Sequence, residues 1–282
     1  MSPNSSPYLD SGGQPCLRKS IVGFLDLLGF SQMAIAETEL EPSQKLLRRI
    51  SAAIDNSRIH VRRILADDFA NRPVSGTVKF FSDNLVLAYP CDLEEDIPEA
   101  TAGFVIRCAQ HYQLQMSLHG FFLRGSLTLG SVCLTEDIIF GASLIESYQL
   151  ESKAAIVPRV LLSYTLRDLL IPSLRTEHSL AAEARQSICR DIDGWWFVNY
   201  LQAATHPDGQ IDWELIHQHK VNVLAATAGV TRHDILPKFG WVARYHNLFC
   251  HWHRLVPGFT DDVLIPRHDA ESMIQRIDDI RS

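Results

Sequence analysis

Two aspartates that follow apolar runs are the residues in this sequence best suited to chemistry. Asp26 follows residues 20–25 (SIVGFL), and Asp83 follows residues 77–82 (TVKFFS). A carboxylate beside a core-forming strand is costly unless it is paired or bound to a cation. Each aspartate alone is as typical of a turn as of a binding site. Two of them on neighbouring strands would form a Mg²⁺ site for phosphate chemistry.

The residues just after Asp26 are candidates for contact with a phosphate chain. The stretch LLGF over residues 27–30 brings backbone N–H groups close to the carboxylate. A triphosphate could lie against such groups. We therefore expect Leu27, Gly29 and Phe30 to contribute to substrate binding.

Lys79 and Phe81 precede Asp83 and are candidates for contact with a base. Lys79 lies four residues before Asp83, so both side chains should project to the same side of a regular strand. Lys79 is otherwise an ordinary exposed lysine. Phe80 and Phe81 alternate in a strand, so one should join the core while the other could stack on a base.

Lys153 or Arg159 could stabilise charge on a transferring phosphoryl group, although most charged residues at such spacing form a solvated helix face. Arg124 lies in the strand-like segment RGSLTLG over residues 124–130 and by itself is typical of an edge-strand arginine.

The pattern of apolar residues and turn signals predicts an α+β fold. The expected elements are strand 20–25, a helix from 41, hairpin strands 77–81 and 85–89, helix 94–118, strands 121–129 and 130–134, helix 140–151 and edge strand 156–163. The first six give the ferredoxin-like order βαββαβ, an antiparallel sheet with helices on one face. In that order both carboxylates fall at the same end of the sheet, where their repulsion favours a bound cation.

Composition limits the classes of protein that remain. The chain has 282 residues, 46% of them hydrophobic, and a formal net charge of -7, which disfavours a non-specific nucleic-acid binder. Its six scattered cysteines predict neither a disulfide framework nor a zinc site. No long apolar run predicts a membrane span, so a cytoplasmic protein is expected. We expect a disordered leader over 1–18, a catalytic domain over 19–165 and a helical extension over 166–282, with helices at 212–229 and 233–255.

The order of these motifs resembles the class III nucleotide cyclases. The resemblance rests on FLDLLGF over 24–30, FSDN over 81–84, RGSLTLG over 124–130 and Phe140-Gly141. Within that family, the segment KFGWVARYHN over 238–247 is similar to an element of the bacterial pyrimidine cyclases of Pycsar antiphage systems.

The resemblance implies a mechanism and a cellular role. Asp26 and Asp83 would hold two Mg²⁺ or Mn²⁺ ions, and UTP would become cyclic UMP, a signal read by a separate effector protein. A homodimer with active sites at its interface is implied, with no nucleic-acid or membrane partner. The alternatives are CTP as substrate, a catalytically silent nucleotide sensor, or a scaffold.

One departure from the family pattern stands out. Class III cyclases usually carry Asn and, four residues later, Arg on the helix after Phe140-Gly141, where this chain has Ile145 and Gln149. The resemblance then implies another transition-state stabiliser, with Arg124 and Lys153 as candidates, or an inactive homologue.

Overall fold

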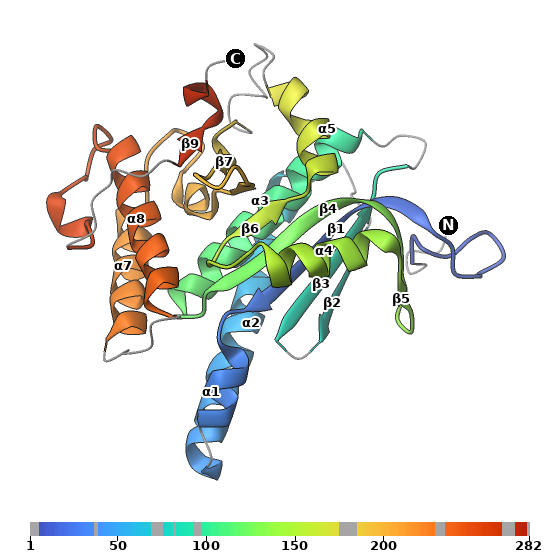
Figure 1. Ribbon diagram of the computed structural model, residues 1–282, viewed down its shortest axis with the longest axis horizontal. Helices are drawn as coiled ribbons and strands as arrows, with labels where there is room; N and C mark the ends of the chain where they lie inside the picture. The colour runs from blue at the N-terminus through green and yellow to red at the C-terminus, as the bar shows by residue number, and fades with distance from the viewer. Residues whose placement is uncertain are drawn as a thin grey trace.

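A computed structural model describes most of the chain, namely residues 6–36, 39–68, 76–81, 83–92, 97–174, 185–228, 235–266 and 274–280. Over these residues the fold is a mixed sheet of nine strands with helices on both faces (Figure 1). The strands are β1 (Arg18–Leu27), β2 (Thr77–Phe81), β3 (Asn84–Pro90), β4 (Leu123–Leu134), β5 (Ile139–Phe140), β6 (Val160–Leu162), β7 (Ile188–Arg190), β8 (Trp196–Val198) and β9 (Gln275–Arg276). The helices are α1 (Phe30–Ala36), α2 (Leu40–Asp68), α3 (Pro98–Leu118), α4 (Ala142–Lys153), α5 (Tyr164–Leu174), α7 (Trp213–Thr227) and α8 (Leu236–Trp252), with short 3-10 turns η1 (Tyr200–Ala204), η2 (Asp261–Val263) and η3 (Ile277–Asp279).

The first half of the chain has the ferredoxin-like arrangement that the sequence predicts. Four strands lie in the order β2-β3-β1-β4, and each neighbouring pair is antiparallel. The predicted β2–β3 hairpin is confirmed, with Phe81 opposite Asn84 at the turn. β1 is therefore a central strand, paired on both sides along most of its length.

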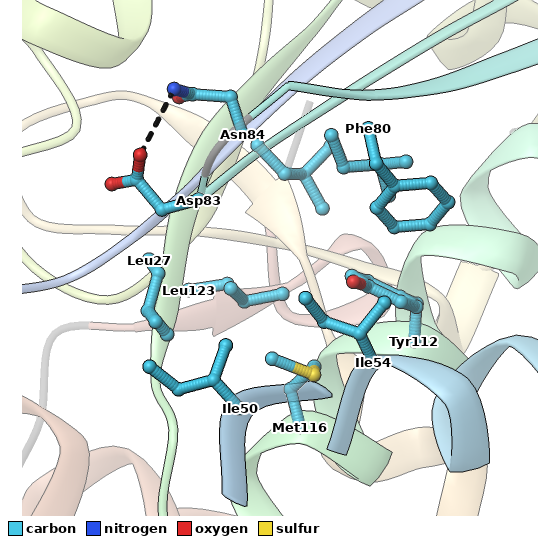
Figure 2. A pocket seen from close by; sticks show the side chains of 11 residues that line it. Leu27, Ile50, Ile54, Phe80, Asp83, Asn84, Tyr112, Met116 and Leu123 are labelled. Carbon is cyan, nitrogen blue, oxygen red and sulfur yellow. Dashed lines mark hydrogen bonds between the residues drawn. The ribbon is translucent and has the colours of Figure 1, made fainter. Parts of the chain in front are cut away.

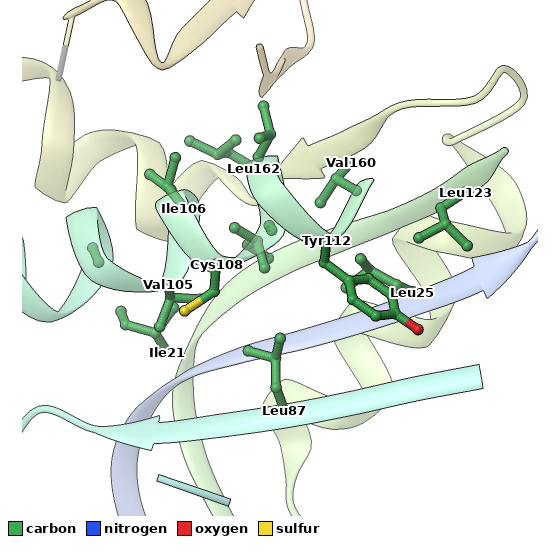
Figure 3. Close-up of a cluster of buried hydrophobic side chains, with 14 of the residues drawn as sticks. Ile21, Leu25, Leu87, Val105, Ile106, Cys108, Tyr112, Leu123, Val160 and Leu162 are labelled. Carbon is green, nitrogen blue, oxygen red and sulfur yellow. The ribbon is translucent and has the colours of Figure 1, made fainter. Parts of the chain in front are cut away.

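Alternation along β1 sends successive side chains to opposite faces of the sheet. Ile21 and Leu25 meet Leu87 and the α3 side chains Val105 and Tyr112 in the main core (Figure 3). Helix α2 also contributes to this core, through Ile50 and Ala53. Phe24 and Asp26 have the opposite parity and point to the face on which α4 lies. The same alternation that builds the core thus delivers Asp26 to the other side of the sheet.

Helix α4 lies close to β4 because small residues line the contact. Ser147 and Ser126 share a hydrogen bond of 2.7 Å between their hydroxyls, and Thr128 Oγ1 donates to the Ser143 carbonyl at 3.0 Å. These bonds satisfy polar groups that are fully or almost fully buried. They fix the position of α4, and with it the residues of its last turn.

The N-terminal segment differs from the expected disordered leader over its described part, residues 6–18. Tyr8 is fully buried against Val22, Val86 and Val132 on the α4 face of the sheet, and its hydroxyl donates to Ser20 Oγ at 3.0 Å. The Ser/Pro/Gly-rich composition of residues 1–18 hid one aromatic anchor, which is enough to hold this segment on the sheet.

Two predictions for the middle of the chain were wrong. β6 was expected at an edge because of Pro158, but it lies inside the sheet between β4 and β8, with Pro158 before its first residue. Residues 130–134 were expected to form a separate strand. They continue β4 to Leu134, and the return strand is the two-residue β5.

The segment from 166 onward was expected to be helical, and it is only partly so. Helices α7 and α8 match the prediction within three residues, but β7, β8 and β9 extend the sheet beyond β6. Strands of two or three residues are too short to show an alternating pattern. A second core joins this region to the sheet through Phe122, Phe197, Tyr200, Tyr245 and Phe249. In the described residues, no helix is long and apolar enough to cross a bilayer.

Candidate active site

One cross-strand row at the end of β1 carries the candidate chemistry. Asp26 lies directly opposite Asn84 on β3 and opposite Arg124 on β4. Residues opposite each other in neighbouring strands share a face. The register therefore places these polar side chains together on the α4 face.

Arg124 joins two carboxylates from different elements. Its Nε and Nη2 atoms each donate to Asp26 Oδ2 at 3.1 Å, and Nη2 also lies 2.7 Å from Glu151 Oε1. Side-chain exposures are 25% for Arg124, 15% for Asp26 and 3% for Glu151. Arg124 is thus the counter-charge of a largely buried acidic pair.

Glu151 was not among the candidate residues in the sequence analysis. It lies in the last turn of α4, an unfavourable place for a negative charge because the helix dipole is negative there. The sequence did contain an indication of its contact with Arg124. An acidic residue in the last turn of a helix is unfavourable unless it has a cationic partner, and Arg124 in a predicted strand was a candidate partner. The contact explains why Glu151 is tolerated there.

Burial and crowding of negative charge raise the pKa of both carboxyls. For Asp26, burial raises the pKa most, Arg124 opposes it, and the nearby Asp83 raises it further. For Glu151, burial and the proximity of Asp26 and Asp83 raise the pKa to about 7 against the pull of Arg124. Arg124 contacts two of these carboxyls, and Asp83 adds a third nearby, so negative charge exceeds positive charge at the site.

Asp83 lies at the β2–β3 turn, above an apolar void. Asn84 Nδ2 donates to Asp83 Oδ1 at 3.4 Å (Figure 2). The void beneath has a volume of about 10 Å³ and is lined by Leu27, Ile50, Ile54, Phe80, Tyr112, Met116 and Leu123, among others (Figure 2). The turn therefore rests on side chains of the core.

The residues present fit a divalent cation held by few protein ligands. No group of three or more His, Cys, Asp or Glu side chains in the described residues is arranged to hold a metal. Asp26 and Asp83, whose proximity raises the pKa of Asp26, are the two carboxylates that could hold Mg²⁺ together with substrate phosphates. The buried Glu151 Oε1 forms no hydrogen bond of good geometry despite its contact with Arg124. A cation bound beside Asp26 and Asp83 would neutralise part of the excess negative charge.

The three candidates after Asp26 are placed less favourably for a phosphate chain. Leu27 is 2% exposed and belongs to the core, and Phe30 packs against that core. The N–H group of the intervening Leu28 donates to the Phe122 carbonyl at 2.9 Å. Gly29 is in the left-handed region with φ of 80°, as the turn between β1 and α1 requires. The Leu28 N–H group is therefore already bonded, at the point where β1 has ended and β4 is about to begin.

Lys79 shares the α4 face with Asp26, while Lys153 does not approach the site. Lys79 pairs with Val86, which pairs with Phe24, so it lies one cross-strand row from Asp26. Its ammonium donates to the carbonyl of Glu136. Lys153 is exposed and two residues beyond Glu151, on a different side of α4. The side chain of Phe81 lies outside the described residues.

The exposed side of α4 carries two large side chains that are mainly apolar, Ile145 and Tyr148. Ile145 is 58% exposed and Tyr148 is 54% exposed, with the Tyr148 ring edge-on to Phe24 at 5.6 Å. Gln149 is exposed beside them. An apolar patch next to the acidic cluster is a feature of surfaces that meet a partner.

No protein-family model and no curated protein matches this chain. Solved structures with a similar fold include the adenylyl cyclase CyaB from P. aeruginosa, at 17% identity and a TM-score of 0.44, over 64% of this chain and 94% of that one. A class III adenylyl cyclase-like ATP-binding protein from Pseudomonas aeruginosa matches at 16% identity and a TM-score of 0.43, over 63% of this chain and 41% of that one. An adenylate/guanylate cyclase/hydrolase from Silicibacter pomeroyi matches at 18% identity and a TM-score of 0.38, over 64% of this chain and 97% of that one. At these identities and TM-scores, no activity and no residue role of this chain follows from the matches.

Proposed function

We propose that this protein is a nucleotide cyclase that converts UTP to 3′,5′-cyclic UMP and pyrophosphate. The observation that carries the proposal is the acidic cluster in which Asp26 and Glu151 contact Arg124 and Asp83 lies close to both carboxyls. Transfer at a triphosphate depends on positioning and on neutralising charge, which a cation-binding carboxylate pair supplies. The choice of uridine is supported by the sequence resemblance alone, and CTP is the alternative substrate.

The residues of the site would divide the work as follows. Asp26 and Asp83 would hold Mg²⁺ or Mn²⁺, which lowers the pKa of the 3′-hydroxyl and neutralises charge on the triphosphate. Arg124 favours the ionised form of Asp26, the form that binds a cation. Lys79 lies on the same face, where exchange of its carbonyl partner for a base would bring it into contact with the nucleotide.

The complete site is proposed to form between two copies of the chain. Ile145 and Tyr148 leave an apolar patch beside the acidic cluster, and a second copy is proposed to cover it. Class III cyclases usually carry Asn and Arg at the positions of Ile145 and Gln149. The partner copy would also supply a group that stabilises the transition state in their place. Ile145→Glu should therefore give a monomer with reduced activity, as judged by analytical ultracentrifugation and product formation.

The proposed product acts as a second messenger in antiphage defence. The enzyme would draw on the nucleotide pool of the cytoplasm, and a separate effector protein would read cyclic UMP. This role rests on the sequence resemblance to the pyrimidine cyclases.

A second candidate is a nucleotide-binding module without turnover. The observation that favours it is the same pair of positions, Ile145 and Gln149, which leave the described chain without the family's stabilising groups. Such a module would bind UTP or CTP with a cation and signal through the C-terminal region.

One experiment separates these candidates. The purified protein is incubated with Mn²⁺ and each of the four nucleoside triphosphates, and products are identified by mass. Cyclic UMP supports the proposal, and cyclic CMP redirects it to CTP. Asp26→Ala and Asp83→Ala should each abolish product, while Asp168→Ala, an exposed site on α5, should not. Triphosphate binding without any cyclic product would support the silent module.

A further inference from the structure

A second, larger cavity lies on the opposite face of the sheet from Asp26. It has a volume of about 160 Å³ and lies among α2, α3 and the β2–β3 hairpin. An apolar engineered cavity of about 150 Å³ is large enough to bind benzene. The space is therefore sufficient for the apolar part of a small ligand.

Among the described residues, the lining of this cavity is mainly apolar, with Leu25, Phe80, Leu85 and Ala109 among its members. The two charged residues of this lining are Arg58 and Arg62 from α2. Leu25, Leu87, Cys108 and Tyr112 are among the core side chains that lie between α3 and the strands in Figure 3. Among the residues that the structure describes, no acidic side chain lines the cavity.

The two guanidinium groups are available at the cavity rather than committed elsewhere in the core. Arg58 lies 4.8 Å from the Phe80 ring centroid, and its ion pair with Asp55, at 3.8 Å, is between exposed side chains. Such exposed pairs are weak and exchange readily. Arg62 is exposed, and its charge opposes the effect of burial, which raises the pKa of Tyr89 in the cavity wall.

We propose that this cavity binds a small amphipathic carboxylate, with its apolar chain inside and its carboxylate on Arg58 and Arg62. A carboxylate matches the planar donors of arginine. An apolar chain matches the remaining wall, where each buried methylene contributes about 0.8 kcal/mol. A neutral or cationic ligand of the same size would gain nothing from the two arginines.

Occupancy of the cavity should stiffen the hairpin that carries Asp83. Phe80 and Leu85 pair across β2 and β3, and both line this cavity and the small void under the Asp83–Asn84 turn. A ligand that packs on this pair favours the arrangement of the turn that it contacts. An effect on cation binding at Asp83 would follow only if the proposed function holds.

The test uses octanoate as the probe and octan-1-ol as its neutral counterpart, with binding measured by calorimetry on the full chain. Octanoate should bind and octanol should bind roughly tenfold more weakly, the loss expected for one charge-assisted hydrogen bond. Arg62→Gln should weaken octanoate binding by a similar factor, while Arg63→Gln, an exposed neighbour outside the cavity lining, should not. Ala109→Leu should fill the cavity and abolish binding of both probes.

The readouts decide the proposal without any measurement of catalysis. Equal binding of octanol, equal effects of the two arginine variants, or retained binding in Ala109→Leu would each overturn the site. Arg62→Gln changes an exposed residue, so a failure of Ala109→Leu to fold would leave the test intact. Hydrogen exchange over residues 77–88 should slow with octanoate, and unchanged exchange in a protein that binds it would overturn the stiffening of the hairpin.

Discussion

Arg124 and Asp26 face each other across the β1–β4 pairing, and two nitrogen atoms of the guanidinium lie 3.1 Å from one carboxylate oxygen. The second contact of Arg124, with Glu151 on α4, ties the strand pair to the helix above it. The positive charge of one side chain thus lowers the pKa of two carboxyls on different elements, against the larger effect of burial. Changes at any of the three residues should appear in the pH dependence of the others.

Replacement of Arg124 by Gln should move metal binding to higher pH. The guanidinium lowers the pKa of Asp26 and of Glu151 against the effect of burial, and Gln cannot do so. The midpoint of Mn²⁺ binding against pH should rise by about one unit, since a close opposite charge shifts a carboxyl by that much or more. Titration calorimetry between pH 5 and 9 measures it. Arg124→Lys keeps the charge and should move the midpoint less; equal midpoints in all three proteins would show that Arg124 has no such role.

Glu151 should make the folded protein less stable as pH rises from about 4.5 to about 7. Its folded pKa is raised to about 7 from the ordinary 4.5, so over this range the folded state holds a proton that the unfolded state has lost. The loss is at most about 1.4 kcal/mol per pH unit. Glu151→Gln removes the titration, so urea unfolding at pH 5 and pH 8 should show wild type losing stability relative to the variant. Glu136→Gln, exposed after β4, is the control that should follow wild type.

The position of Asp26 at a strand end could be predicted from sequence, and its surroundings could not. Alternation and the βαββαβ order were enough to bring Asp26 and Asp83 to one end of the sheet, because period-two patterns survive in long strands. Glu151 escaped notice because its contact with Arg124 depends on how close α4 approaches β4. That distance is set by Ser126 and Ser147, which carry no pattern of their own.

In the C-terminal region, too, the sequence predicts elements with a local pattern and misses those that depend on tertiary contacts. Its helices have several turns in which to display apolar spacing, and they were predicted within three residues. β7 and β8 each have three residues and are recognised only by the partners they meet. Tertiary pairing, rather than local preference, determines these strands.

Two buried histidines should make the C-terminal core sensitive to acid. His246 Nε2 lies 2.9 Å from the Val263 carbonyl, which only accepts, so this nitrogen carries the proton. His246 Nδ1 then accepts from His219 Nδ1 at 2.9 Å, and His219 Nε2 accepts from the Tyr200 hydroxyl at 2.8 Å. Both rings are neutral, and a further proton on either would break this chain of bonds.

Burial lowers the pKa of His246 to about 4 and that of His219 well below 6.5, so the unfolded state takes up protons first as pH falls. Stability should therefore decrease from pH 6.5 toward pH 4, by up to about 1.4 kcal/mol per pH unit for each histidine. Denaturant unfolding, monitored by the fluorescence of Trp241 and the tryptophans near it, measures the slope of the free energy of unfolding against pH. His206→Gln, exposed, should retain the slope, and His246→Gln should reduce it; an unchanged slope in His246→Gln would contradict the assignment.

Gly125 should tolerate no side chain, because β1 and β4 approach closely beside the Asp26–Arg124 pair. A Cβ at this position would lie 2.4 Å from the Phe24 carbonyl oxygen and 2.9 Å from Leu25 Cα, both backbone atoms that cannot rotate away. Gly125→Ala should lower the free energy of unfolding by about 1–3 kcal/mol or more, the range for overpacked sites. Gly103→Ala is the matched control, since a Cβ there meets nothing within 4 Å in α3. It should raise stability by roughly 0.5–1 kcal/mol through helix propensity. Urea unfolding of both variants tests this prediction. Equal free energies of unfolding would show that β1 and β4 move apart at Gly125 without loss of stability.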